Sequence, residues 1–172
     1  MSYQRVTPAE WERWIQHPAA ARIPSGKSLS VLDAGSTEIT TWAEIRHLDL
    51  YKNWDCLHYL LTGWSVFSQE NDFGSPLSRI LTGGGETTIP CGYGFVRFLM
   101  PGDVSALSEV LQDVHEDELR AGFWRNLPQS SEVYAFNGDE IELDTALTSF
   151  ALVRAFFSHA AQAGDVILLS SD

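Results

Sequence analysis

LDLYKNWDCLHYLLTG, residues 48–63, has the clearest helical pattern in the chain. Large side chains recur at the i, i+3, i+4 and i+7 spacing of one helix face: Trp54, Leu57, His58 and Leu61. Asp49 is a suitable N-cap and Gly63 a suitable C-terminal stop. The stretch therefore predicts an amphipathic helix that buries one face against the rest of the molecule.

Further helices are expected on both sides of this stretch. Thr7-Pro8-Ala9-Glu10 is a capping box with proline at the first helical position, and it predicts a helix that ends near His17. A second helix should begin at Pro101, and a short one should span Glu116–Trp124. A long helix is expected from about Asp144 to Ala163, because Gly164 follows it.

Strands are expected in smaller number. Their β-branched and aromatic content predicts Tyr93–Leu99, Val133–Phe136 and Val166–Leu169, with a short strand at Leu29–Leu32 inside a loop-like region from Ile23 to Ser36. The residues from Trp64 to Ser75 resemble a loop, and Pro76–Leu81 is a short apolar segment. Helices and strands mix without regular βαβ alternation, and no linker or repeat is visible. The sequence therefore predicts a single α+β domain over residues 1–172.

Composition narrows the function classes. Eleven Lys and Arg face 23 Asp and Glu, so the formal charge is −12. Such a charge repels phosphate backbones and anionic lipids, which argues against a nucleic-acid partner and against a membrane. No apolar run approaches the roughly 18 residues of a spanning helix, and no secretory signal is visible, so a cytoplasmic protein is expected. Cys56 and Cys91 are too few for a disulfide framework.

Three blocks of the sequence resemble the YfbM-like family, small bacterial domains of unassigned function. The first is Leu48–Gly63, with its Leu-His-Tyr-Leu-Leu-Thr-Gly ending, and the second runs from Ile80 through Gly83-Gly84-Gly85-Glu86 and Gly92-Tyr93-Gly94 to the Pro101 helix. The third joins Val153–Phe157 to Ala163–Leu169. The resemblance implies a compact α+β fold and no particular activity. Residues from about Ile23 to His47 depart from the family's pattern.

His58 is the main candidate for chemistry. Asp55 precedes it by three residues, so its carboxylate could orient the imidazole, as a general base requires. With Tyr59, Tyr93 and the Gly83–Tyr93 loop, these residues form a hypothetical ligand pocket. The alternative is a packed, hydrogen-bonded structural histidine. The glycine run lacks the Lys and Ser/Thr of a P-loop, so a flexible turn is the simpler interpretation.

The acidic excess is concentrated between Glu109 and Asp144, where ten acids face only Arg120 and Arg125 and the charge is −8. This stretch is either a solvated face or a docking surface for a basic protein. The candidate contact residues are Glu109, Asp113, Glu116, Asp117, Glu118, Trp124, Asp139 and Glu140.

Three hypotheses follow. The first is a non-enzymatic acidic binding protein, such as an immunity protein that blocks the basic cleft of a bacterial toxin domain. The second is a small-ligand binder or enzyme with the pocket around His58. The third is a structural domain that forms a homo-oligomer. The five histidines show no metal-binding spacing, so no metal site is predicted. No cofactor and no catalytic residue is predicted either.

Overall fold

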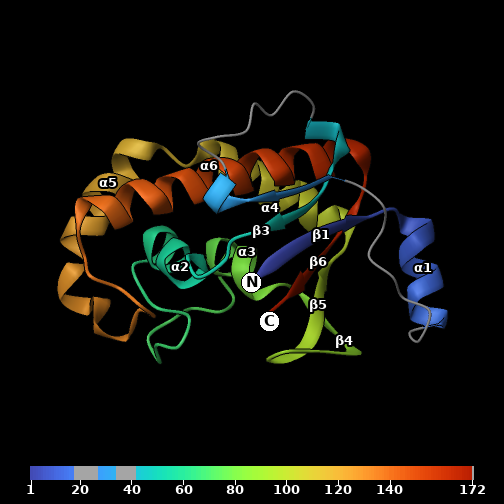
Figure 1. Cartoon of the computed structure of the whole chain (residues 1–172), viewed down its shortest axis with the longest axis horizontal. Helices are drawn as coiled ribbons and strands as arrows, with labels where there is room; N and C mark the ends of the chain where they lie inside the picture. Colours follow the sequence, from blue (N-terminus) through green and yellow to red (C-terminus); the bar gives the residue numbers. More distant parts are fainter. Residues whose placement is uncertain (18–26, 34–41, 172) are drawn as a thin grey trace.

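The computed structural model describes residues 1–17, 27–33 and 42–171. Their centre is a six-stranded mixed sheet in the order β2-β3-β1-β6-β5-β4 (Figure 1). The strands are β1 (Ser2–Val6), β2 (Lys27–Ser30), β3 (Ile45–Asp49), β4 (Gly85–Cys91), β5 (Gly94–Leu99) and β6 (Val166–Ser170). β2 and β3 are parallel and the other pairs are antiparallel. The first and last strands are therefore neighbours at the centre of the sheet.

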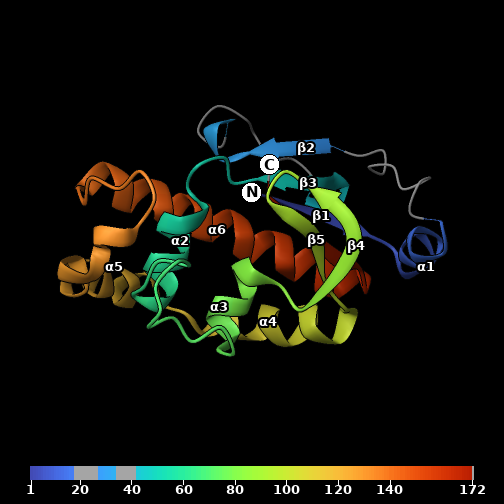
Figure 2. The ribbon, with the colours of Figure 1, turned by 90° about the horizontal axis from the view of Figure 1, so that it is seen from below.

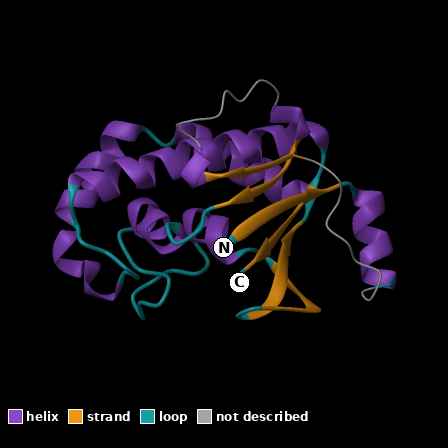
Figure 3. Cartoon of the chain, in the orientation of Figure 1, coloured by secondary structure: helices purple, strands orange, loops and turns teal. Residues whose placement is uncertain are grey.

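The helices lie mainly on one face and at one end of this sheet (Figures 2 and 3). They are α2 (Trp54–Thr62), α3 (Pro76–Thr82), α4 (Pro101–Asp113), α5 (Glu116–Arg125) and α6 (Glu140–Ala163). Short 3₁₀ turns occupy Val31–Asp33, Trp42–Glu44 and Leu127–Glu132. The predicted α+β class is confirmed. No helix among the described residues is both long and apolar enough to cross a bilayer.

Strand register decides which side chains face the helices. Tyr3 lies opposite Leu48 on β3 and Leu169 on β6, and all three are buried in the main core with α6. The Tyr3 hydroxyl donates to the carbonyl of Ile80 at 3.0 Å, so the central strand is also tied to α3. Because successive side chains alternate across a strand, the neighbouring Leu168 faces the other side of the sheet.

The opposite face carries a smaller apolar cluster beneath α1 (Pro8–Gln16). The predicted capping box is present: Thr7 accepts from the backbone of Glu10, and the Glu10 carboxylate accepts from the backbone of Thr7. Trp11 packs with Val6 and Leu168, and its ring lies 4.6 Å from that of Phe98. The helix ends at Gln16, close to the predicted His17.

Several sequence expectations need correction. Asp49 does not cap α2; it ends β3 and accepts from the backbone of Tyr51, while α2 begins at Trp54 after Asn53. Strands β1, β3 and β4 were not predicted, and β2 ends at Ser30 instead of reaching Leu32. The long helix begins at Glu140, four residues before the predicted start, because Asp139 caps it.

The predicted strand Val133–Phe136 is a turn. Ala135 has a φ of 54°, outside the strand region. The backbone N–H of Tyr134 donates to the Asp55 carboxylate at 2.8 Å. A tertiary contact with α2 therefore replaces the strand pairing that its aromatic and β-branched residues indicated.

Candidate functional site

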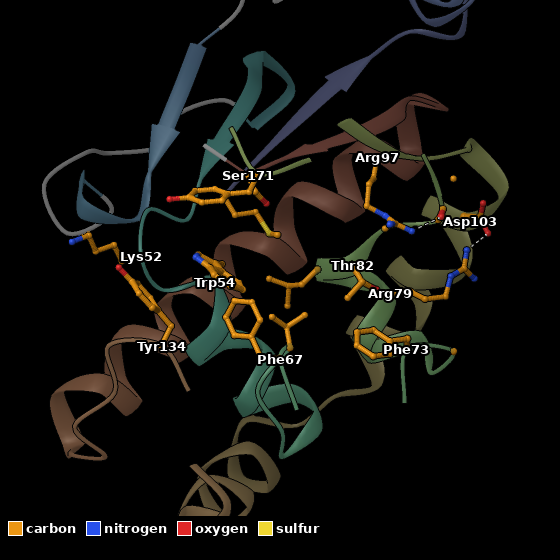
Figure 4. Close-up of a pocket in the computed structure, with 18 of the residues that line it drawn as sticks. Lys52, Trp54, Phe67, Phe73, Arg79, Thr82, Arg97, Asp103, Tyr134 and Ser171 are labelled. Atoms are coloured by element: carbon orange, nitrogen blue, oxygen red, sulfur yellow. Dashed lines mark hydrogen bonds and ion pairs between the residues drawn. The ribbon is translucent and has the colours of Figure 1, made fainter. Parts of the chain in front are cut away.

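A cleft of about 1250 Å³ opens between the sheet edge and the loops around α2 and α3 (Figure 4). Its walls come from segments far apart in the sequence: the turn before α2, the loop between α2 and α3, the glycine turn after α3, β5, and Tyr134 before α6. Ligand pockets commonly enclose about 300–1,000 Å³. The cleft therefore has room for a small organic molecule and accompanying water.

Aromatic side chains make up much of the lining. Trp54 is partly buried and fixed by its neighbours: its ring contacts Phe67 edge-on at 5.6 Å and is nearly parallel to Tyr134 at 6.4 Å. Five further aromatic side chains of the lining are between 47% and 83% exposed: Tyr51, Phe67, Phe73, Tyr93 and Tyr134. Exposed aromatic rings gathered in one concavity are typical of binding sites.

The charge of the cleft is opposite to that of the chain. Lys52, Arg79 and Arg97 line it together with a single carboxylate, Asp103, which leaves a formal charge of +2. The whole chain carries −12. Three of its eleven cationic side chains thus lie in the cleft, against one of its 23 acidic ones. The described lining therefore carries side-chain charge opposite in sign to that of the protein as a whole.

The two arginines differ in how fully they are neutralised. Arg79 donates to Asp103 at 2.7 Å. Arg97 makes a longer ion pair of 3.4 Å with Glu86 and donates to the carbonyl of Gly84 at 3.1 Å. The Nε of Arg97 is buried and has no hydrogen-bond partner within the described part of the chain. Arg97 is therefore the less compensated of the two cations.

The glycine turn lets these arginines lie close to the backbone. Gly83 ends α3 with a φ of 70°, and a Cβ built on it would come within 3.0 Å of Cβ of Arg97. A Cβ on Gly84 would lie 3.0 Å from the Phe98 carbonyl, and one on Gly85 would overlap the Phe98 ring. The predicted turn between helix and strand is present. Its glycines are needed for close packing against β5.

Backbone strain is found at the cleft margin. Within the described residues, the non-glycine positions with positive φ are Tyr51, at 52°, and Ala135, at 54°. Tyr51 lines the cleft and Ala135 follows Tyr134, which also lines it. Such conformations cost about 1–3 kcal/mol each and persist where surrounding contacts enforce them.

Asp55, in the core beside the cleft, makes one of the contacts next to the strained Ala135. Its carboxylate is fully buried and accepts from the backbone N–H of Val66 and of Tyr134, both at 2.8 Å. It also accepts from the hydroxyl of Ser65 at 2.9 Å. Val66 and Tyr134 are lining residues. The one buried carboxylate of Asp55 therefore connects two separate walls of the cleft.

His58 has a similar supporting position. Its Nδ1 lies 2.8 Å from the carbonyl of Trp64 and its Nε2 lies 3.1 Å from Oγ of Ser78. Burial lowers the pKa of His58, so the imidazole is neutral near pH 7. A carbonyl only accepts, so Nδ1 carries the proton and donates to Trp64, while Nε2 lies beside the Ser78 hydroxyl, which also donates to Oδ1 of Asn71 at 3.3 Å. The ring joins the loop after α2 to α3.

The proposed pocket around His58 must therefore be revised. Asp55, His58 and Tyr59 are almost fully buried and do not line the cleft, whereas Tyr93 is 83% exposed and does. Asp55 binds Ser65, Val66 and Tyr134 and does not orient the imidazole. The Tyr59 hydroxyl donates to the carbonyl of Phe123 at 2.7 Å. Residues on the buried face of α2 support the site from beneath it.

The acidic surface is defined here by the exposed acids of α4, α5 and the start of α6. Every predicted contact residue on it is exposed: Glu109, Asp113, Glu116, Asp117, Glu118, Trp124, Asp139 and Glu140. Several acids have local partners. Arg120 bridges Glu116 and Asp144, and Asp139 caps α6 by accepting from Glu142. Phe123 is buried, whereas Trp124 is 40% exposed.

Metal and thiol chemistry have little support among these residues. Across residues 1–17, 27–33 and 42–171, no three His, Cys, Asp or Glu side chains are grouped to hold a metal ion. Cys56 and Cys91 are both free thiols. Burial raises the pKa of Cys56 to about 12, so its thiol is unreactive near neutral pH.

Sequence reasoning missed most of the cleft. It identified Tyr93 and the glycine turn, but not Phe67, Arg79 or Arg97. It assigned Trp54 to the buried face of a helix. The available signal was the scarcity of cations in an acidic chain, where each arginine is a candidate to bind an anion or to pair with an acid. Their convergence depends on tertiary contacts, which local spacing does not reveal.

Comparison with known proteins identifies relatives without a known activity. The family model described as a domain of unknown function, DUF1877, matches residues 1–170. Protein YfbM of Escherichia coli (strain K12) is 34% identical over 96 residues, which are 55% of this chain and 54% of that protein. The aligned part thus spans about half the length of this curated relative.

The crystal structure of YfbM from Escherichia coli, a protein of unknown function, superimposes with a TM-score of 0.65. That match covers 97% of this chain and 96% of the other at 19% identity, so it confirms the expected fold. Because the family model spans nearly every residue, the chain belongs to the DUF1877 family, and it is similar to YfbM in sequence and in fold.

Proposed function

We propose that this chain is a binding protein whose binding site is the aromatic, cationic cleft. The observation that carries the proposal is the combination of a 1250 Å³ concavity with exposed aromatic rings and a charge opposite to that of the chain. Solvating charges alone would not gather cations and aromatic rings in one hollow. The support from Asp55 and His58 means that the walls are held in place before a ligand arrives.

Binding is favoured over catalysis by the chemistry of the lining. Among the described residues that line the cleft there is no histidine, cysteine or glutamate, and the one carboxylate, Asp103, is paired with Arg79. A general base needs a positioned group that can take up a proton. His58 is a natural candidate by type, but it is fully buried and hydrogen-bonded on both ring nitrogens.

A crystallographic fragment screen tests this function directly. Aromatic fragments are expected to gather between Trp54 and the glycine turn, because that region offers both an aromatic wall and hydrogen-bond donors. A screen in which bound fragments avoid the cleft, or gather on the acidic surface instead, would contradict the proposal.

The second candidate function is docking of a basic protein, such as a toxin domain that an immunity protein neutralises. The observation in its favour is the pairing of exposed apolar side chains with the acids of α5 and α6. Ile141 is 76% exposed and Trp124 is 40% exposed. Aromatic anchors within a charged surround are common in protein interfaces.

This candidate has a separate test. The tagged full-length chain is used to capture partners at low and moderate salt, alongside a variant with Glu116, Asp117 and Glu118 reversed to Lys. Docking through the acidic surface predicts one stoichiometric partner, weakened by salt and lost in the variant. A partner retained by the variant, or the absence of any partner at both salt concentrations, would exclude it.

A further inference from the structure

The two ends of the cleft differ in chemistry. Trp54, Phe67 and Tyr134 form an aromatic wall at one end, with Lys52 at its margin, and both arginines of the lining, Arg97 and Arg79, lie at the other (Figure 4). A ligand that spans both ends needs a flat apolar part and an anionic part. This polarity goes beyond the general capacity to bind, because it restricts the class of ligand.

Arg97 is the group that would receive the anion. Its ion pair with Glu86 is 3.4 Å long and its side chain is 42% exposed, so the pair is weak and screened by solvent. Each terminal nitrogen has two N–H groups: Nη1 directs one to Glu86 and Nη2 one to Gly84. The second N–H of each nitrogen has no assigned acceptor among the described residues. A carboxylate has two oxygens with which to meet such donors.

The pairing of the two arginines also limits the negative charge that a ligand can carry. Arg79 is already committed to Asp103 at 2.7 Å, and Glu86 lies beside Arg97. One incompletely compensated guanidinium suits a single negative charge. A phosphate monoester would bring a second charge toward two nearby carboxylates in a chain of charge −12.

We propose, on the basis of the binding function argued above, that the ligand is an aromatic monocarboxylate with its carboxylate on Arg97 and its ring against Trp54. The shared chemistry is a carboxylate attached to an aromatic group, which either a small organic acid or the free C-terminus of a peptide supplies.

Isothermal titration with three matched probes tests the assignment: 2-naphthoate, the uncharged 2-naphthamide and the dianionic 2-naphthyl phosphate. The expected result is that 2-naphthoate binds at least tenfold more tightly than the amide and no less tightly than the phosphate. Arg97→Met should abolish the preference over the amide, and Arg97→Lys should retain part of it. Arg13→Met, which removes one positive charge from exposed α1, should leave it unchanged.

The outcomes separate the two proposals. If the amide binds as tightly as the carboxylate, or the phosphate binds more tightly, the ligand assignment fails while the cleft remains a binding site. If Arg97→Met keeps the preference, the assignment of Arg97 fails. If none of the three probes binds, both proposals fail. If 2-naphthoate shows the expected preference, the tripeptide Ala-Ala-Phe and its C-terminal amide distinguish the two sources of the carboxylate. Tighter binding of the free tripeptide than of 2-naphthoate indicates a peptide C-terminus, and weaker binding indicates a small organic acid.

Discussion

The cleft and the acidic surface are built in opposite ways. In the cleft, side chains from segments far apart in the sequence converge on one hollow, and buried groups such as Asp55 support its walls. On the acidic surface, acids of consecutive elements project into solvent. Some of them form exposed ion pairs there, as Glu116 and Asp144 do with Arg120. Sequence composition reveals the second kind of region and conceals the first.

The two regions differ in how firmly their side chains are held in place. Exposed ion pairs contribute about 0–1 kcal/mol each and are screened by salt. Buried hydrogen-bonded groups cost more to disturb, because the partners that remain lose their hydrogen bonds. A site supported from within the core is therefore more rigid than one formed by solvated charges. Four substitution or titration experiments test whether the two regions differ in this way.

The largest effect is expected from removing the buried support. Asp55→Ala leaves two backbone N–H groups and one hydroxyl without an acceptor, and such groups cost about 1–3 kcal/mol each. Urea denaturation should show a loss of about 3 kcal/mol or more in the free energy of unfolding. The matched control, Asp113→Ala on the acidic surface, should change it by no more than about 0.5 kcal/mol. Equal losses in the two variants would remove the distinction between the regions.

The next effect concerns two tryptophans. Trp54→Ala removes the aromatic wall of the cleft and should weaken 2-naphthoate binding roughly tenfold, which corresponds to about 1.4 kcal/mol. Trp124→Ala, on the acidic surface, should leave that affinity unchanged. Fluorescence or calorimetric titration of both variants provides the measurement. If Trp124→Ala lowers the affinity and Trp54→Ala does not, the binding site lies on the acidic surface and not in the cleft.

The third effect is a dependence of stability on pH. Burial lowers the pKa of His58 in the folded chain, whereas the unfolded chain has the ordinary value of about 6.5. Below about pH 6.5 the unfolded state therefore binds more protons than the folded state, so stability falls as the pH falls toward the folded pKa. The slope contributed by this one residue is at most about 1.4 kcal/mol per pH unit.

Denaturation curves between pH 5 and 7.5 measure this slope. His58→Gln, which cannot take up a proton in this range, should give a flatter profile than the unsubstituted chain. A profile of equal slope in both proteins would show that His58 is not held neutral, and would weaken its assignment as a buried support.

The smallest effect is expected on the acidic surface itself. Glu116→Gln, Asp117→Asn and Glu118→Gln together remove three exposed charges from the first turn of α5. The affinity for 2-naphthoate should change less than twofold, because exposed charges beyond about 8–10 Å are screened at physiological salt. A larger change would mean that the two regions are electrostatically coupled.

Much of the fold followed from local patterns in the sequence. The capping box at Thr7, the stop at Gly63 and the helix that begins at Pro101 were predicted because each depends on neighbouring residues. The strands β1 and β3 escaped prediction because they are only five residues long, and their apolar alternation is interrupted by Arg5 and His47. Arg5 is buried with partners that are distant in the sequence, among them Asp165, 160 residues later, which forms an ion pair with it.

The site was less predictable for the same reason. Helical spacing correctly placed Asp55 and His58 near one another on α2, yet it could not show that their partners would be Val66, Tyr134 and Trp64. Their polar type suggested chemistry, whereas their burial makes them supports. The exposed Phe67 lies in a loop with no periodic pattern, and its place in the cleft is fixed by packing against Trp54.

Chemical-shift mapping of the ¹⁵N-labelled chain with 2-naphthoate tests the central claim, that the cleft is the binding site, most directly. The account predicts concentration-dependent shifts at the Trp54 indole, the backbone amides of Gly83–Gly85 and Tyr134, and the side chain of Arg97, with the amides of Glu116–Glu118 unmoved. Shifts confined to α5 and the start of α6, or no shifts up to the solubility limit of the probe, would contradict it.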